Sequence, residues 1–149
     1  MSNYDALKLE NQLCFPLYAA AKEVVRKYRP LLDELDLTYT QYIVMMVLWE
    51  YGEMNVKDLG KRLYLDSGTL TPLLKTMEKK GYINRIRDKH DERNVVIRLT
   101  QEGDSLRERA VTVPEQMGKC VPLTSEEAVT LYKLLYKLLN SFDGSESDG

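Results

Sequence analysis

The sequence predicts a mostly α-helical chain with a small β-hairpin wing, a winged helix-turn-helix whose N- and C-terminal helices form a dimerisation domain. Three observations in the 149 residues carry this prediction. Two short helical patterns flank a turn between residues 56 and 81, and two strand patterns flank a charged tip between residues 83 and 99. Longer amphipathic helical patterns lie at both ends of the chain. A winged helix-turn-helix places one helix in the DNA major groove and a hairpin beside it.

The helix-turn-helix begins with residues 56–63, where apolar residues recur at helical spacing. A turn at residues 64–66 follows, and Asp66 or Ser67 is expected to cap the second helix through a short side-chain oxygen. Gly81 ends that helix. Its buried face is predicted to contain Leu70, Leu73, Leu74 and Met77. Its other faces carry small or basic polar residues, which are Ser67, Thr69, Thr71 and Lys75.

The predicted hairpin consists of Ile83–Arg87 and Val95–Leu99, which alternate apolar with polar or basic side chains. The tip between them, Asp88–Asn94, is wholly polar. From Lys61 to Arg98 there are ten Lys/Arg and five Asp/Glu, a net charge of +5, whereas the whole chain carries −2. A basic stripe on an acidic protein is the footprint expected of phosphate contact, so double-stranded DNA is the predicted partner. The alternative is a solvated charged hairpin on an unrelated small domain.

The remaining segments are predicted to be helical. Residues 6–28 carry an apolar stripe, Thr40 is expected to cap the helix that ends before Gly52, and Thr100 to open a helix that runs to about Gly118. Thr124 opens the last helix. The chain is therefore expected to be a single domain, residues 1–149. It divides into a DNA-binding region of about residues 38–100, dimerisation helices at about 5–30 and 101–141, and a disordered tail at 143–149.

The apolar stripes of the end helices are wider than one small winged domain needs to cover. We therefore expect a symmetric homodimer, which suits a protein that reads an inverted repeat. Composition predicts a cytoplasmic protein, because no apolar run approaches membrane length and the N-terminus lacks a signal-peptide pattern. Two distant cysteines form neither a disulfide framework nor a zinc cluster, and His90 has no neighbouring ligand, so no metal or cofactor is expected.

The sequence resembles the MarR family of bacterial regulators, and within it the branch of organic hydroperoxide resistance repressors (OhrR). The resemblance covers about residues 5 to 140. The segments that carry it are LCFPLYA from Leu13, YRPLL from Tyr28, LTYTQY from Leu37, LYLDSGTLTP from Leu63, and the Asp-Glu-Arg wing tip at residues 91–93. Thr40 departs from the family, which commonly has proline there; either residue suits a helix start.

The resemblance implies that Cys14 senses peroxide, which requires a thiolate because the thiol is a poor nucleophile. A helix start near Pro16 and the hydroxyl of Tyr18, four residues on, are candidate stabilisers of that thiolate. The resemblance also implies that Tyr28 and Tyr39 contact the reactive cysteine. Tyr28 lies fourteen residues after Cys14, which is ~21 Å along one helix. It is therefore expected to reach the partner's cysteine across a two-fold axis.

Without the resemblance, Cys14 reads as a small buried hydrophobe and the tyrosines as ordinary packing residues. Cys120, in a predicted loop between the last two helices, is either a cysteine that resolves the sulfenic acid as an intersubunit disulfide or a spectator thiol. The family contains both one-cysteine and two-cysteine types.

The predicted function is a DNA-binding repressor, not an enzyme, that leaves an inverted-repeat operator when organic hydroperoxide oxidises Cys14. Ser67, Thr69, Thr71 and Lys75 are expected to face the major groove. Arg85, Arg87 and Arg93 are expected to contact backbone or minor groove, with Asp91 orienting Arg93 by a salt bridge. Three alternatives stay open: a MarR-like regulator that responds to a small-molecule ligand, a broader redox regulator of virulence or resistance, and a thiol peroxidase that uses Cys14.

Overall fold

A computed structural model describes residues 3–146 of the chain, with side chains up to residue 142. The chain forms two compact units, Met1–Glu115 and Gln116–Gly149. The first unit begins with two 3-10 turns, η1 (Asp5–Leu7) and η2 (Leu9–Asn11), and contains α1 (Cys14–Asp33), α2 (Tyr39–Tyr51), β1 (Glu53–Asn55), α3 (Val56–Leu63), α4 (Ser67–Lys79), β2 (Ile83–Arg87), β3 (Val95–Leu99), α5 (Gln101–Ser105) and α6 (Arg107–Ala110). Helix α7 (Val113–Cys120) crosses the boundary, and α8 (Ser125–Glu146) belongs to the second unit.

The first long helix begins later than the sequence predicted. Helix α1 starts at Cys14 rather than near residue 6, because residues 5–11 form two 3-10 turns. Side chains hold these turns: Asn11 Nδ2 donates to the Asp5 carbonyl at 2.7 Å and Gln12 Nε2 to the Ala6 carbonyl at 2.6 Å. Pro16 falls in the first turn of α1, where a missing N–H costs nothing, so it suits a helix start.

Helix α2 is capped by Thr38, so the expectation of a Thr40 cap was wrong. The Thr38 hydroxyl accepts from the Gln41 N–H at 3.3 Å, and Gln41 Oε1 accepts from the Thr38 N–H at 3.1 Å. This reciprocal capping box needs a glutamine three residues after the cap, which only Thr38 has. The helix ends at Gly52, whose φ of +82° lies in the left-handed region.

The helix-turn-helix agrees with the prediction in both of its helices. Helix α3 spans Val56–Leu63 and α4 spans Ser67–Lys79, with Asp66 as the cap of α4: its carboxylate accepts from the Thr69 N–H at 2.8 Å. The core of the unit lies between α2, α3, α4 and the sheet. Its fully buried members include Val44, Met45, Leu48, Leu59, Leu70, Leu74, Met77, Ile83 and Ile97. Leu73, predicted for the same face, is only half-buried.

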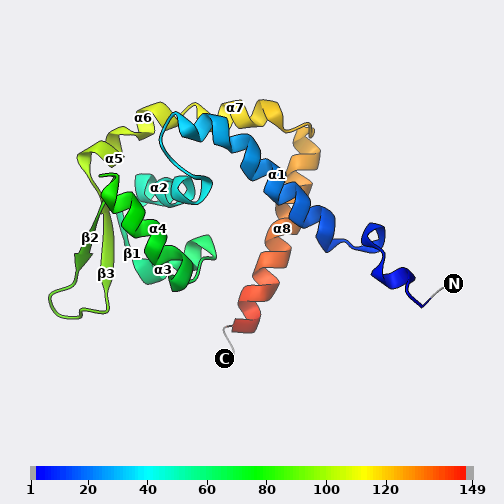
Figure 1. Cartoon of the computed structure of the whole chain (residues 1–149), viewed down its shortest axis with the longest axis horizontal. Helices are drawn as coiled ribbons and strands as arrows, with labels where there is room; N and C mark the ends of the chain where they lie inside the picture. Colours follow the sequence, from blue (N-terminus) through cyan, green and yellow to red (C-terminus); the bar gives the residue numbers. More distant parts are fainter. Residues whose placement is uncertain (1–2, 147–149) are drawn as a thin grey trace. The chain divides into compact units, whose positions relative to one another are not determined.

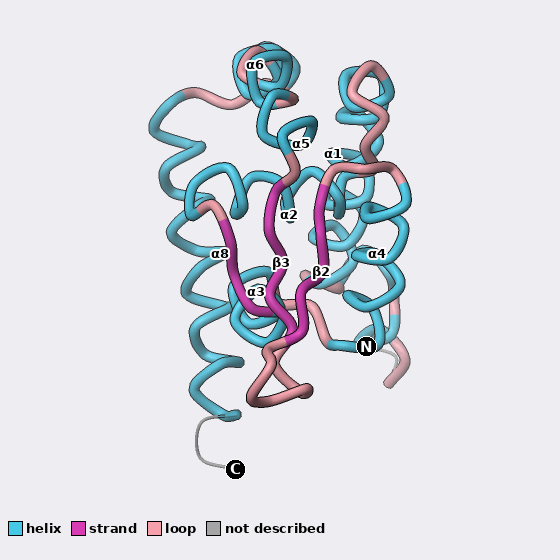
Figure 2. Tube along the Cα trace, turned by 90° about the vertical axis from the view of Figure 1, so that its left-hand side faces the viewer, coloured by secondary structure: helices cyan, strands magenta, loops and turns pink. Residues whose placement is uncertain are grey.

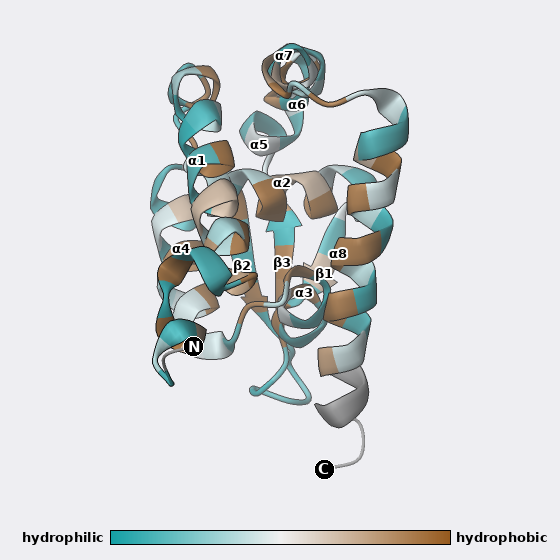
Figure 3. Ribbon diagram, turned by 90° about the vertical axis from the view of Figure 1, so that its right-hand side faces the viewer, coloured by the Kyte–Doolittle hydropathy of each residue, from teal (hydrophilic) through white to brown (hydrophobic). Residues whose placement is uncertain are grey.

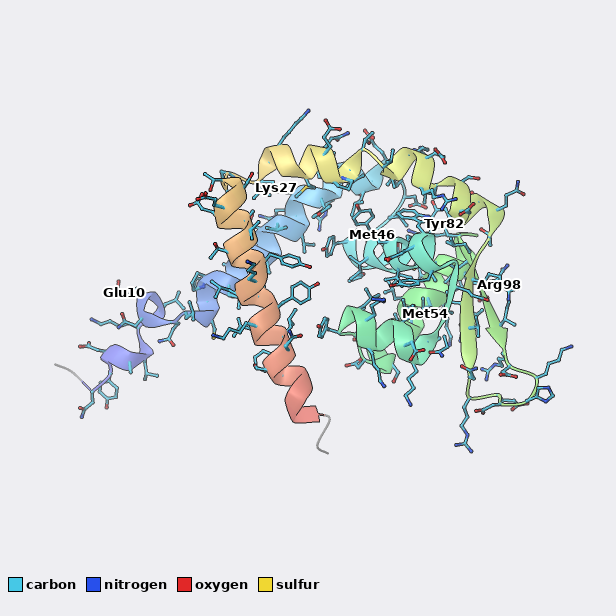
Figure 4. The ribbon with its side chains drawn as sticks, turned by 180° about the vertical axis from the view of Figure 1, so that it is seen from behind. Glu10, Lys27, Met46, Met54, Tyr82 and Arg98 are labelled. Atoms are coloured by element: carbon cyan, nitrogen blue, oxygen red, sulfur yellow. The ribbon has the colours of Figure 1, made fainter. Side chains whose placement is uncertain are left out.

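The sheet has three antiparallel strands in the order β1-β3-β2. Strands β2 and β3 occupy the predicted ranges, and their loop projects beyond α3 and α4 as a wing (Figure 1; Figure 2). Strand β1 was not predicted, because three residues are too few to display an alternating pattern. It pairs Met54 with Ile97, and its Glu53 binds the Arg98 guanidinium at 2.9 Å. Figure 4 labels Met54 of this strand and Arg98 of β3.

The segment after the wing is divided more finely than expected. Thr100 is the predicted cap, since its hydroxyl accepts from the Gly103 N–H at 3.0 Å. The prediction of a single helix that runs to about Gly118 was wrong, because the structure has three separate helices there, α5, α6 and α7. Pro114 accounts for the second interruption, because it lacks the N–H that would bond to the Ala110 carbonyl and suits the first turn of a new helix, α7.

The second unit is dominated by α8. Thr124 and Glu127 form the predicted capping box, with hydrogen bonds of 2.9 and 3.1 Å. Helix α8 continues to Glu146, so residues 143–146 are helical and the prediction of a disordered tail was wrong for them. Residues 147–149 of that predicted tail lie outside the described residues. Within residues 3–146, no helix is both long and apolar enough to span a membrane.

Candidate DNA interface and sensor site

The face of α4 that the sequence predicted for DNA is turned to solvent. Ser67, Thr69 and Lys75 are exposed and Thr71 is half-buried. Buried Leu70, Leu74 and Met77 hold the opposite face of the helix against the core. The polar face therefore combines short hydroxyl side chains with one cation, which suits close approach to base edges and phosphates.

The wing tip is ordered by its own carboxylates. Asp88 Oδ1 accepts from the His90 N–H at 2.9 Å, and Asp88 Oδ2 from the Asn94 amide at 3.4 Å. These two bonds, the backbone one first, hold the pKa of Asp88 below its ordinary value. Asp91 accepts from the backbone N–H of Arg93 at 3.1 Å, so it orders the turn rather than forming the salt bridge expected with the Arg93 guanidinium.

The arginines of the wing differ in their environment. Arg87 and Arg93 are exposed, and Arg87 donates to the Glu92 carbonyl at 3.2 Å. Arg85 is half-buried: its backbone N–H donates to Glu78 of α4 at 3.2 Å. Its Nε is buried and has no hydrogen-bond partner among the described residues. The guanidinium of Arg85 is therefore partly buried at the seam between α4 and the wing, unlike those of Arg87 and Arg93.

The basic stripe is narrower than the sequence count indicated. Arg98 is paired with Glu53, and the Lys80 ammonium donates to the Asp36 carbonyl at 2.8 Å and to Gln41 Oε1 at 3.0 Å. These two cations stabilise the fold. A sequence cannot separate them from the cations on the exposed face, since their partners lie about 40 residues away in the chain.

Cys14 is the first residue of α1 and is exposed. Tyr18, four residues on in the same helix, is 64% exposed. Helix α1 runs without interruption from Cys14 to Asp33, which supports the ~21 Å separation between Cys14 and Tyr28 in one chain.

Tyr28 and Tyr39 meet in the first unit, together with Tyr42, a residue that the sequence reading missed. The ring centroids of Tyr28 and Tyr39 are 4.9 Å apart, and those of Tyr28 and Tyr42 are 5.8 Å apart. Burial raises the pKa of Tyr28 and of Tyr39, and burial with the neighbouring phenols raises the pKa of Tyr42 to about 12. The hydroxyls therefore remain protonated donors at neutral pH. The signal for Tyr42 was its spacing of three residues from Tyr39 on the same helix.

This tyrosine cluster predicts a specific loss of stability in alkali. The pKa of Tyr42 lies near 12 when folded and near 10 when unfolded, so the folded chain holds its proton more tightly. The stabilisation is complete below pH 10 and is lost as pH rises towards 12. Since one pKa unit corresponds to ~1.4 kcal/mol, the Tyr42→Phe protein should lose roughly 2 kcal/mol less stability across that range than the wild type. Urea unfolding at pH 8, 10 and 11.5 measures the free energy of unfolding of both proteins. If that free energy falls equally with pH in wild type and Tyr42→Phe, the prediction is contradicted.

Cys120 is exposed and ends α7, rather than lying in a loop as expected. Four residues later the chain reaches Thr124, the cap of α8. The second unit thus presents a thiol at a helix C-terminus.

Helices α1 and α8 each present large apolar side chains to solvent. Leu32 is the only fully buried residue of α1 among those the structure describes, whereas Phe15, Leu17, Val24 and Val25 are at least 40% exposed. Helix α8 exposes Val129, Leu131, Tyr132, Leu134, Tyr136 and Leu138, and hydrophobic bands run along it (Figure 3). Large apolar side chains exposed along two helices are typical of an interaction surface.

Helix-turn-helix, wing and exposed polar recognition face together define a DNA-binding transcriptional regulator. Comparison with known proteins agrees: residues 26–110 match the family model described as transcriptional regulator SarA/Rot. The chain belongs to the MarR family, in the branch of organic hydroperoxide resistance regulators. It is 47% identical, over 94% of its length and 95% of the relative's, to the organic hydroperoxide resistance transcriptional regulator of Bacillus subtilis.

Solved structures of AbfR, a protein of Staphylococcus epidermidis, are similar over nearly the whole chain. Reduced AbfR bound to DNA superposes with a TM-score of 0.79 at 29% identity, covering 96% of this chain and 98% of that one. Disulfide-formed AbfR gives a TM-score of 0.66 at 32% identity, covering 93% and 94%. The Bacillus subtilis relative is a transcriptional regulator, a class of protein that is not enzymatic.

Proposed function

We propose that the chain is a homodimeric repressor that senses organic hydroperoxides by oxidation of Cys14 and then releases an inverted-repeat operator. The observation that carries the proposal is an exposed cysteine at the start of α1 in a chain whose α1–α2 corner holds a cluster of protonated tyrosines. The similarity to an organic hydroperoxide resistance regulator, and to a protein with reduced and disulfide forms, supports it.

The dimer is supported by the exposed apolar faces of α1 and α8. Burying the side chains that these helices present would stabilise association by ~25 cal/mol for each Å² removed from water. A symmetric dimer presents two copies of α4, which suits an operator with two half-sites.

The sensor is proposed to be shared between subunits. Because ~21 Å separates Cys14 from Tyr28 along α1, the tyrosine cluster of one chain serves the cysteine of the other when the two α1 helices cross antiparallel. Cys14 and Tyr18 then come from one chain and Tyr28 and Tyr39 from its partner. Phenol hydroxyls that donate to the sulfur stabilise a thiolate without a nearby Lys or Arg.

The proposed oxidation begins from a Cys14 thiolate that accepts hydrogen bonds from tyrosine hydroxyls. The Cys14 sulfur attacks the distal oxygen of the hydroperoxide, the O–O bond breaks, and the alkoxide takes a proton and leaves as the alcohol. Cys14 becomes a sulfenic acid. A second thiol, proposed to be Cys120 of the partner subunit, then displaces water to form a disulfide. If Cys120 is a spectator, a small cellular thiol takes that role.

On DNA, Ser67, Thr69, Thr71 and Lys75 are proposed to face the major groove, while Arg85, Arg87 and Arg93 contact the phosphate backbone or minor groove. Asp91 supports Arg93 by ordering its backbone. Oxidation breaks the tyrosine contacts to the sulfur and moves α1, so that the spacing of the two α4 helices no longer matches the half-sites.

The proposed function is tested by titrating cumene hydroperoxide against the protein bound to an inverted-repeat promoter fragment. Wild type should release the DNA, and a dimer-sized band on non-reducing gels should appear with oxidation and disappear in Cys120→Ser. Sedimentation of the reduced protein should give about twice the 17.3 kDa chain mass. A concentration-independent monomer, or a wild type that holds DNA through full oxidation of Cys14, would overturn the proposal.

One cavity supports a second candidate, a regulator of the same family that responds to an organic acid. The cavity has a volume of about 450 Å³ and lies between α1 and the start of α2. Its lining includes Lys22, Arg26, Arg29, Leu37 and Tyr39. Asp33 also lines the cavity, so three cations face one carboxylate, and the excess of positive charge suits a small carboxylate ligand. Release of DNA by such an acid under reducing conditions would favour this candidate over peroxide sensing.

A further inference from the structure

The turn between α1 and α2 is held by side chains from two other parts of the chain, α6 and the connection between α4 and β2. Three successive carbonyls of the turn each accept a hydrogen bond: that of Glu34 from Arg109 of α6, that of Leu35 from Tyr82, and that of Asp36 from Lys80. We call these three donors the turn clasp. All of them, with the turn, lie in the first unit.

Lys80, which caps the C-terminus of α4, makes the largest set of contacts in the turn clasp. Its ammonium donates to the Asp36 carbonyl at 2.8 Å and to Gln41 Oε1 at 3.0 Å, and it lies 3.5 Å from the Asp36 carboxylate. Its side chain is only 24% exposed. Asp36 has a φ of +55°, which disfavours a residue with a Cβ, so the contacts from Lys80 help to hold a strained turn.

Tyr82 connects the same turn to the base of the wing. Its hydroxyl donates to the Leu35 carbonyl at 3.1 Å and its side chain is 8% exposed. Its backbone N–H donates to Met77 of α4, and its carbonyl accepts from Thr100 at the end of β3, at 3.2 and 3.1 Å. In Figure 4 it lies at the end of the hairpin remote from the tip. Tyr82 therefore joins the turn to both DNA-contacting elements.

The tyrosine cluster flanks this turn on both sides. Tyr28 stands on α1 before it, and Tyr39 is the first residue of α2 after it. Gln41, which is 4% exposed, accepts with the same oxygen from the Thr38 N–H and from Lys80. A shift of the start of α2 thus changes the capping box of α2 and the anchor of α4 together.

We propose that Lys80 and Tyr82 are positioning residues that transmit the state of the tyrosine cluster to the recognition helix and wing through the α1–α2 turn. The inference rests on the proposed redox function. Physically, it requires that the clasp be made in one state of the dimer and loosened in the other, because a contact that is equal in both states transmits nothing. Charge-assisted hydrogen bonds in a mostly buried site are strong enough to bias such an equilibrium by about tenfold.

The test compares Lys80→Met with Lys79→Met. Lys79 is the neighbouring cation at the end of α4 and is exposed, so both variants lose one positive charge near the DNA. For each protein the release factor is measured, defined as the DNA dissociation constant after oxidation divided by that of the reduced protein. The rate of Cys14 oxidation is followed in parallel by thiol labelling.

We expect Lys80→Met to oxidise Cys14 at the wild-type rate but to show a release factor lowered about tenfold. Lys79→Met should keep the wild-type factor. Lys80→Arg preserves a cationic donor, so its release factor should be close to that of wild type. Tyr82→Phe, which removes a single hydroxyl, should lower the factor by a smaller amount and serves if Lys80→Met does not fold.

Equal release factors in Lys80→Met, Tyr82→Phe and wild type would overturn the inference while leaving the proposed function intact. A lowered factor in Lys79→Met equal to that in Lys80→Met would also overturn it, since the effect would then be one of charge. If wild type itself does not release DNA on oxidation, the proposed function fails, and the inference fails with it.

Discussion

Replacing Cys14 by serine should yield a protein that binds its operator like reduced wild type and does not release it when organic hydroperoxide is added. A serine hydroxyl is not ionised at neutral pH and does not attack the O–O bond, so the chemical step is lost. Cys14 is exposed at the start of α1, and serine is close in size, so the fold should be unchanged. The affinity of the reduced state should therefore stay within about twofold.

The expected size of the difference follows from the shift in populations. If oxidation takes the dimer from about 99% to about 1% binding-competent, the apparent dissociation constant rises as the competent fraction falls, so the release factor of wild type is ~100 and that of Cys14→Ser stays near 1. Fluorescence anisotropy of a labelled operator, measured at rising concentrations of cumene hydroperoxide, gives both values.

Cys120→Ser is the matched control, because it removes the other thiol, also exposed. If Cys120 resolves the sulfenic acid, the control releases DNA but forms no disulfide-linked dimer. If Cys14→Ser releases DNA as readily as wild type, Cys14 is not the sensor and the search turns to the cavity beside Arg29.

Gly103→Ala is expected to destabilise the fold by about 3 kcal/mol and to lower Tm by roughly 10 °C. A Cβ at this position would lie 2.1 Å from the carbonyl oxygen of Tyr82, which is backbone and is held by the Thr100 N–H. Gly103 also accepts from the Trp49 indole at 2.9 Å, so α5 has no freedom to withdraw without losing that bond. The clash therefore strains the junction of α2, α5 and the base of the wing.

Gly118→Ala provides the comparison for this substitution. Gly118 lies within α7, and a Cβ there would meet no atom within 4 Å. Alanine favours the helix over glycine, so this variant should be slightly more stable, by about 0.5–1 kcal/mol. Thermal unfolding followed by circular dichroism measures both. A Gly103→Ala protein as stable as wild type would show that β2 and α5 separate easily.

Elements that depend on neighbours in the chain were predictable. The ranges of α3, α4, β2 and β3 follow from apolar periodicity, and Asp66 and Thr124 act as caps because their side chains reach backbone N–H groups three residues on. The candidate residues Cys14, Tyr28 and Tyr39 came from a family resemblance, and the structure brings Tyr28 and Tyr39 together.

The errors arose where two local signals competed. Thr38 and Thr40 are both acceptable caps, and the buried Gln41 selects Thr38 because only that choice completes a capping box. The apolar stripe upstream of Cys14 looks helical, yet side-chain bonds from Asn11 and Gln12 stabilise 3-10 turns instead. Strand β1 needs β3 as a partner and has no signature of its own in three residues.

The sequence by itself determined the kind of protein this is: a winged helix-turn-helix with a net basic recognition segment, because helix and strand periodicity and capping are local properties. Only the tertiary structure decided which cations are engaged within the fold, that Tyr42 joins Tyr28 and Tyr39, and that Lys80, Tyr82 and Arg109 converge on one turn. These contacts join residues up to 75 positions apart, and their strength depends on burial and on donor–acceptor geometry, which no local pattern encodes.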